Sequence, residues 1–138
     1  MKTTLLKRVS VIVFGFVSIL GMGAVNAAHP PSVAGNWNAT ANQTLGALVI
    51  FQPANGAVCK PITGFIFGSS IEGFYCPVTG RLTFARRMAG GLVPFQLYEG
   101  HVSRDAAIDR IGGSFIVWNA LGGGLPNEGV DFNFSATR

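Results

Sequence analysis

The chain has 138 residues, of which 49% are hydrophobic and only 12% are charged, so one domain of this length carries enough apolar side chains for its own core. Its formal net charge is +4, but three of its ten basic residues, Lys2, Lys7 and Arg8, stand at the N-terminus. The remainder carries seven basic and six acidic side chains and is nearly neutral, which argues against a protein that attracts nucleic acid by its overall charge.

The N-terminal segment has the features of an export signal. Its basic residues precede the apolar run Val9–Val25, and Val25-Asn26-Ala27 provides small residues for cleavage. A membrane anchor is the alternative, but several glycines interrupt the run. We therefore expect a signal peptide over residues 1–27, a single domain over residues 28–138, and a secreted or periplasmic protein that is not held in a membrane once the signal is removed.

Short β-rich runs separated by turn residues follow the signal. We expect eight strands, in chain order Gly35–Thr40, Leu45–Phe51, Ile62–Phe67, Ile71–Tyr75, Arg81–Arg87, Val93–Val102, Arg110–Val117 and Val130–Arg138. Because Leu45–Phe51 is apolar at almost every position, it predicts a strand buried on both faces. Ala28–Val33 contains two consecutive prolines and predicts a loose arm, while the charged segment Ser103–Asp109 predicts a turn.

The clearest hairpin lies between Pro61 and Cys76, where two β-rich runs flank the turn residues Gly68-Ser69-Ser70. Such a hairpin brings Cys59 and Cys76 within a few residues of each other at its open end. In an exported protein this arrangement predicts a disulfide, which would contribute about 3 kcal/mol in the chain-entropy model. Two buried free thiols are the alternative.

The pattern as a whole predicts an all-β fold. Eight short strands without an amphipathic helical stretch are typical of an eight-stranded antiparallel up-and-down β-barrel, whose interior accommodates side chains or one small ligand. A β-sandwich is the competing architecture.

Six short segments, taken in order, resemble the avidin and streptavidin family. They are Ala34–Trp37, Ile62–Gly64, Ile71–Tyr75, Gln96–Gly100, Arg110-Ile111 and Gly129–Asp131. The resemblance implies an avidin-like barrel in which Trp37 packs beneath Arg138 at the closed end. Lipocalins share the Gly-x-Trp element, so a lipocalin-like carrier of an apolar small molecule is a further alternative.

The family's ligand is biotin, but most of the positions that would hold biotin have changed. By this match, the polar residues that meet the ureido oxygen are replaced by Ala39, Ile66 and Gly68, and either Asn38 or Asn42 could substitute for the asparagine lost at Ala39. The tryptophans are replaced by Arg86, Tyr98 and Phe115. The family's aspartate is retained as Asp131, although Phe132, Phe134 and Ala136 compete with it for the inward face. The resemblance thus implies a rebuilt pocket for biotin or another small carboxylate-bearing molecule, bound with weakened affinity.

Six residues are therefore candidates for ligand binding: Asn42, Arg86, Gln96, Tyr98, Phe115 and Asp131. Gln96 and Tyr98 share one face of their strand by the period of two, and an inward-facing Arg86 would favour an anionic ligand. The sequence suggests no enzyme, cofactor or metal site, because His29 and His101 are its only histidines and match no catalytic or metal-binding spacing.

The apolar exterior predicts a second property. Both faces of Leu45–Phe51 are apolar, and barrels of this kind cover such surface by pairing, so we expect a homo-dimer or tetramer. If rings such as Phe84, Phe115 and Phe134 filled the interior, the alternative would be an oligomeric scaffold without a ligand.

Overall fold

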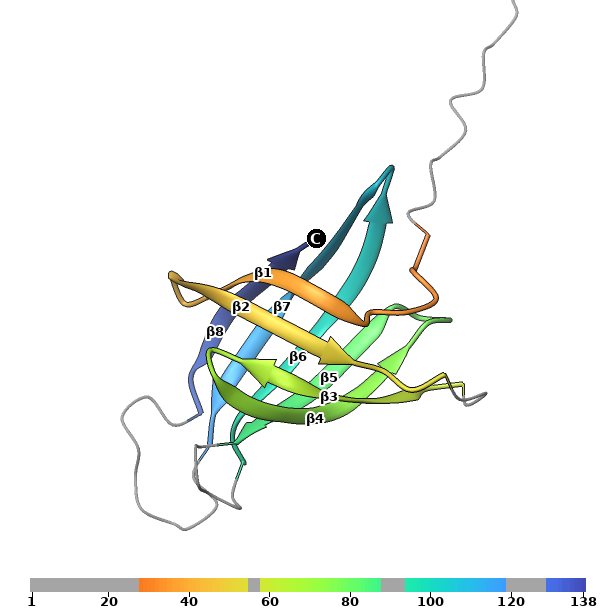
Figure 1. The fold of residues 1–138 in the computed structure, drawn as a ribbon. Coiled ribbons are helices and arrows are strands. Elements are labelled where there is room, and N and C mark those ends of the chain that lie inside the picture. The colour runs from red at the N-terminus through yellow and green to blue at the C-terminus, as the bar shows by residue number, and fades with distance from the viewer. Residues whose placement is uncertain (1–27, 55–57, 88–93, 119–128) are drawn as a thin grey trace, which may run out of the picture.

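The computed structural model describes residues 28–54, 58–87, 94–118 and 129–138, so the expected signal peptide lies outside the described residues. The strands are β1 (Gly35–Ala41), β2 (Thr44–Phe51), β3 (Lys60–Ile66), β4 (Ser69–Cys76), β5 (Arg81–Arg87), β6 (Pro94–Asp105), β7 (Ile108–Val117) and β8 (Asp131–Thr137). Each strand pairs antiparallel with the next, and β8 pairs back onto β1 (Figure 1).

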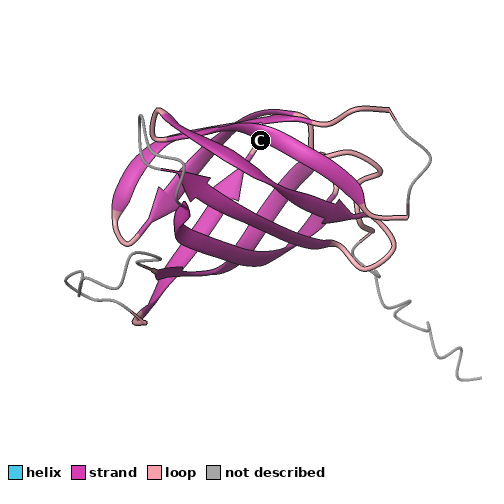
Figure 2. Ribbon diagram, turned by 90° about the horizontal axis from the view of Figure 1, so that it is seen from below, coloured by secondary structure: helices cyan, strands magenta, loops and turns pink. Residues whose placement is uncertain are grey.

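The closure between β1 and β8 confirms the predicted eight-stranded up-and-down barrel and excludes a two-sheet sandwich. Strands and loops make up the whole described chain (Figure 2). No helix within the described ranges is long and apolar enough to cross a membrane.

The barrel interior is filled in its middle by aromatic rings from the neighbouring strands β5 and β6 and from β8. Phe84 of β5 stacks on Tyr98 of β6 with ring centroids 4.6 Å apart, and Phe134 of β8 meets both rings edge-on at 5.9 and 5.0 Å. All three side chains are buried. Rings in offset-stacked and edge-to-face contact stabilise a core beyond the area they bury, so this cluster closes the centre of the barrel to a ligand.

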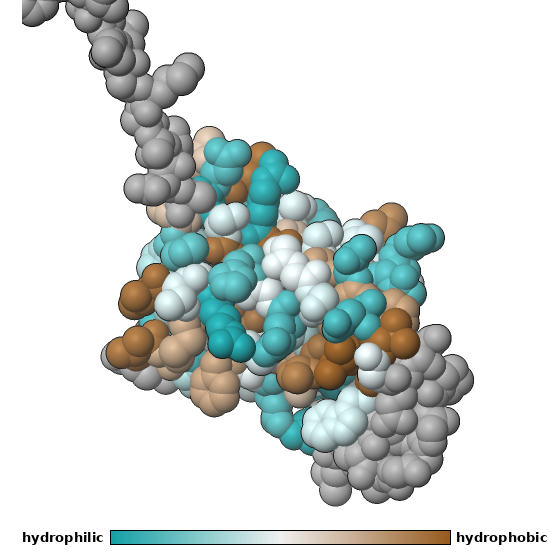
Figure 3. Space-filling model, turned by 180° about the vertical axis from the view of Figure 1, so that it is seen from behind, coloured by the Kyte–Doolittle hydropathy of each residue, from teal (hydrophilic) through white to brown (hydrophobic). Residues whose placement is uncertain are grey.

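The apolar composition of β2 predicted a strand buried on both faces, but only one of its faces is buried. Leu48 and Ile50 point into the core, whereas Leu45 and Phe51 are 80% and 54% exposed. A run of apolar residues therefore alternates between the interior and an apolar outer face. Apolar patches also occur between polar side chains on the rear of the molecule (Figure 3).

The β3–β4 hairpin turns one residue earlier than predicted. Phe67 and Gly68 form its two-residue turn, with φ of 49° and 76°, and Ser69 and Ser70 already belong to β4. Positive φ at both central residues matches the right-handed twist of the strands, which compensates for the cost of placing phenylalanine there. At the other end of the hairpin, Cys59 and Cys76 form the predicted disulfide.

The arm before β1 is not loose, because it plugs one end of the barrel. Pro30 and Val33 are fully buried, the Tyr75 hydroxyl donates a hydrogen bond of 2.5 Å to the Pro30 carbonyl, and the Trp37 indole N–H donates one of 2.9 Å to the Val33 carbonyl. Burial, with a smaller contribution from nearby Asp109, raises the pKa of Tyr75 to about 12. We call this end of the barrel the closed end.

A buried carboxylate completes the closed end, in a segment that the sequence had predicted to be a turn. Strand β6 continues to Asp105, the turn is only Ala106-Ala107, and Asp109 lies inside the barrel. Asp109 accepts hydrogen bonds from Arg104 at 2.6 and 3.0 Å and from Arg138 at 2.7 and 2.9 Å. The hydrogen bonds from Arg104, together with those from Arg138, hold the pKa of Asp109 below its usual value.

The last residue holds several parts of the closed end together. The Arg138 guanidinium lies 4.4 Å from the centroid of the Trp37 ring, so the two residues meet as the family resemblance implies. The same guanidinium donates to the carbonyl oxygens of Ser32 and Ala34. Arg138 thus links the arm, β1 and Asp109 of β7.

Candidate ligand site at the barrel mouth

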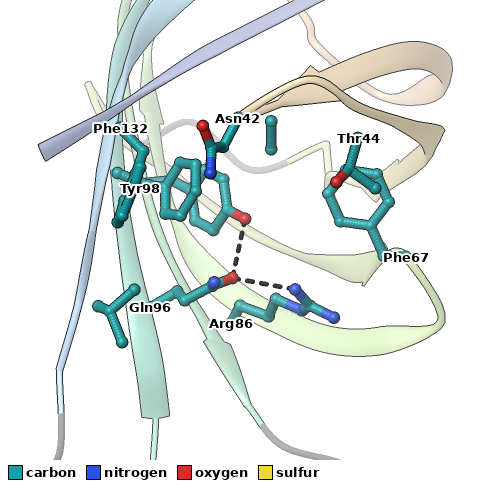
Figure 4. A pocket seen from close by; sticks show the side chains of 10 residues that line it. Asn42, Thr44, Phe67, Arg86, Gln96, Tyr98 and Phe132 are labelled. Carbon is teal, nitrogen blue, oxygen red and sulfur yellow. Dashed lines mark hydrogen bonds between the residues drawn. The ribbon is translucent and has the colours of Figure 1, made fainter. Parts of the chain in front are cut away.

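The opposite end of the barrel, which we call the mouth, contains a cavity of about 310 Å³. It lies among the β1–β2 turn, the β3–β4 turn and the inward side chains of β5 to β8 (Figure 4). Its lining residues are Ala41, Asn42, Thr44, Phe67, Arg86, Gln96, Tyr98, Phe115, Val117 and Phe132. The mouth is therefore open above an interior that is filled in its middle.

Arg86 is held in place from three sides. Its Nη1 donates to Gln96 Oε1 at 3.0 Å, its Nη2 donates to Ser69 Oγ at 3.1 Å, and its guanidinium carbon lies 5.4 Å from the centroid of the Phe67 ring. The guanidinium is thus oriented before any ligand arrives, so a ligand would not have to order this long side chain at its own cost.

Tyr98 and Gln96 continue this network (Figure 4). The Tyr98 hydroxyl donates to Gln96 Oε1 at 2.9 Å, so this oxygen accepts from both Tyr98 and Arg86. Burial raises the pKa of Tyr98 while the positive charge of Arg86 acts in the opposite direction, and the phenol remains neutral at physiological pH. The group that Gln96 still has to offer a ligand is its NH₂ donor.

Aromatic rings form one wall of the cavity. Tyr98 stacks on Phe115 with centroids 4.8 Å apart, and Phe115 stacks on Phe132 at 5.2 Å. Phe67 stands on another side of the opening, and Asn42 lies across the cavity from Gln96 and Arg86 (Figure 4). The site therefore combines apolar walls with a small number of oriented hydrogen-bond donors, which is the composition of small-molecule pockets.

The structure brings five of the six candidate residues to this cavity: Asn42, Arg86, Gln96, Tyr98 and Phe115. Asp131 is not with them. It is exposed on the outside of β8, because Phe132 and Phe134 take the inward positions of that strand, and Asp131, one position before Phe132, therefore points outward.

Six residues of the site were not among the candidates: Ala41, Thr44, Phe67, Val117 and Phe132, which line the cavity, and Ser69, which accepts a hydrogen bond from Arg86. Phe132 has a sequence signal, since it lies two positions from the inward Phe134. Phe67 and Ser69 have no such sequence signal. The face that each of them occupies depends on where the turn begins, and the sequence does not reveal that it begins at Phe67.

No three His, Cys, Asp or Glu side chains lie close enough to hold a metal ion in the part of the chain that the structure describes. Comparisons of the chain with protein-family models, with curated proteins and with solved structures found no match.

Proposed function

We propose that this chain is an exported, avidin-like barrel that binds a small anionic molecule of the carboxylate class in the mouth cavity. The avidin-like character is supported by the order of the matching segments and by the contact between Trp37 and Arg138 at the closed end of an eight-stranded barrel. Export is supported by the Cys59–Cys76 disulfide, since such bonds persist in oxidising compartments.

The proposal of an anionic ligand rests on the oriented guanidinium of Arg86. It is the one charged side chain among the described residues that line the cavity, and its neighbours there offer further donors through the carboxamides of Gln96 and Asn42. Hydrogen bonds from a cation to a carboxylate are roughly twice as strong as neutral ones. A ligand that accepts from several donors, and carries a negative charge, matches this site best.

The size of the cavity limits the ligand. A volume of about 310 Å³ corresponds to that of roughly ten water molecules, so the ligand has on the order of ten to fifteen non-hydrogen atoms. At about −0.3 to −0.6 kcal/mol per atom, such a ligand binds with a dissociation constant in the micromolar to millimolar range.

Thermal-shift titrations test this proposal. We expect small carboxylates such as 3-phenylpropionate, and biotin if it fits, to raise the melting temperature, and the matching uncharged amides to raise it less. Arg86→Gln should weaken carboxylate binding at least tenfold. Arg81→Gln is the matched control, because Arg81 lies on the same strand but is exposed on the outside.

Three results would contradict the proposal. The first is that no member of the panel raises the melting temperature of the wild-type protein at millimolar concentration. The second is that the amides stabilise it as well as the acids do, and the third is that Arg86→Gln leaves the carboxylate titration unchanged.

The outer face of β2 to β4 favours a second candidate function, an oligomeric scaffold. Phe51, Phe65 and Phe74 are 54%, 48% and 58% exposed there, and Phe51 and Phe65 meet edge-on at 6.4 Å. Adjacent exposed rings are characteristic of interaction surfaces, and we expect a second copy of the chain to cover them. Sedimentation should then show a dimer or larger assembly without ligand, which Phe65→Ser dissociates, whereas a monomeric wild-type protein would exclude this candidate.

A further inference from the structure

We infer that the anionic group of the ligand is attached to a planar aromatic ring, which extends a stack of rings already present in the barrel. This inference rests on the proposed function and specifies its ligand class. It follows from how the aromatic wall ends at the mouth.

The stack runs across four neighbouring strands. Phe84 of β5, Tyr98 of β6, Phe115 of β7 and Phe132 of β8 follow one another, with interplanar angles of 11°, 19° and 26° between successive rings. The two residues of each pair lie directly opposite each other on neighbouring strands, as Phe84 does with Tyr98 and Phe115 with Phe132. Near-parallel rings repeated at neighbouring positions define a direction in which a further ring can be added.

The stack ends at Phe132 because the next strand supplies no ring. Strand β1 lies beside β8 and ends at Ala41, and Asn42 follows in the β1–β2 turn. Both residues line the cavity together with Phe132. Phe132 is only partly buried, unlike the three rings that precede it. A small side chain next to a partly exposed ring leaves room for a ring that belongs to the ligand.

The positive charge of Arg86 determines where the carboxylate end of the ligand would lie. Arg86 comes from β5 and lies across the mouth from Phe132, where it donates a hydrogen bond to Gln96 (Figure 4). A ligand that spans the cavity would therefore set its ring against Phe132 and its carboxylate on Arg86. A six-membered ring with a short acidic side chain has about the number of atoms that a cavity of 310 Å³ can hold.

A pair of acids that differ only in the ring tests this inference. 3-Phenylpropionate and 3-cyclohexylpropionate have the same length and charge, but the saturated ring carries the larger apolar surface. Burial alone therefore predicts that the cyclohexyl acid binds at least as tightly. Ring stacking predicts that the phenyl acid binds about two- to tenfold more tightly to the wild-type protein, as measured by isothermal titration calorimetry.

Variants locate the effect. Phe132→Leu should remove the preference for the phenyl acid, whereas Phe51→Leu, a change of the same type on the outer face, should keep it. A second measurement needs no variant, because stacking on an aromatic face moves the ring-proton signals of bound 3-phenylpropionate upfield in NMR spectra.

The outcomes separate this inference from the proposed function. Equal or tighter binding of the cyclohexyl acid, or a phenyl preference that persists in Phe132→Leu, would overturn the aromatic ligand but leave a carboxylate site at Arg86. If neither acid binds, both the inference and the proposed function fail. Tighter phenyl binding with upfield ring signals would support both.

Discussion

Replacing Asp109 by asparagine removes one negative charge from the closed end of the barrel and hardly changes the size of the side chain. Asp109 is 4% exposed and receives four hydrogen bonds from the guanidinium groups of Arg104 and Arg138. The variant therefore leaves two positive charges facing a neutral amide, one of whose two polar groups is a donor.

The expected cost follows from the exposure of the partners. Removing one member of a fully buried ion pair costs about 3–5 kcal/mol. The side chains of Arg104 and Arg138 are 43% and 24% exposed, so water can reach both, and Arg138 keeps its bonds to the Ser32 and Ala34 carbonyls. We expect Asp109→Asn to lower the free energy of unfolding by about 2 kcal/mol, which corresponds to a fall of about 6–12 °C in melting temperature.

Urea unfolding at pH 7 measures this loss, and Glu99→Gln is the matched control. Glu99 forms an ion pair with Arg81 at 3.1 Å, but both side chains are more than half exposed, so its removal should cost less than about 0.5 kcal/mol. Because the pKa of Asp109 is lowered in the folded protein, its stabilisation is complete above the usual pKa of aspartate and is lost as the pH falls through the lowered value.

The wild-type protein should therefore lose more stability than Asp109→Asn between pH 5 and pH 2. Equal losses from Asp109→Asn and Glu99→Gln at pH 7 would refute this reasoning. So would parallel acid profiles for the wild-type protein and Asp109→Asn.

Three further predictions concern the frame of the barrel. Tyr75 has a pKa raised to about 12, so the stability that its neutral phenol provides is present below pH 10 and is lost as the pH rises toward 12. Tyr75→Phe should therefore lose less stability than the wild-type protein over this pH range, as measured by urea titrations. An equal loss in both proteins would contradict this prediction. A Cβ at Gly113 would lie 2.0 Å from the Glu99 carbonyl oxygen, whereas a Cβ at Gly112 would meet nothing within 4 Å. Gly113→Ala should therefore lower the free energy of unfolding by at least about 2 kcal/mol, and Gly112→Ala by less than about 0.5 kcal/mol. Similar losses in the two variants, measured by chemical unfolding, would refute the close approach of the backbones at Gly113. Replacing Cys59 and Cys76 together by serine should lower the free energy of unfolding by about 3 kcal/mol, and dithiothreitol should then have no further effect on that double variant.

Local patterns allowed much of the fold to be predicted from the sequence. The bounds of β5 match the alternating run Arg81–Arg87, and the disulfide followed from the hairpin that brings Cys59 toward Cys76. Turn residues and the period of two both act over a few residues, which is why they could be read from the chain alone.

Features that depend on distant residues could not be predicted in this way. Asp109 looked like a turn residue because its partner Arg138 is 29 positions away in the chain. The apolar composition of β2 could not distinguish a buried face from an exposed apolar one, so the whole strand was predicted to be buried on both faces, although Phe51 is exposed. Phe67 was predicted to end a strand, but it lies in the β3–β4 turn, where its ring borders the mouth and contacts Arg86. This was missed because the register of a hairpin depends on the position of its turn.

The central claim is that a small carboxylate binds at Arg86 in the mouth of the barrel. An NMR titration of the isotope-labelled protein with 3-phenylpropionate tests it most directly, because it reports where the ligand binds as well as whether it binds. We predict saturable shifts that are largest for the Arg86 guanidinium and for the side-chain amides of Gln96 and Asn42, with small shifts around Phe65 on the outer face. Shifts concentrated on the outer face, or none at the mouth at millimolar ligand, would contradict the claim.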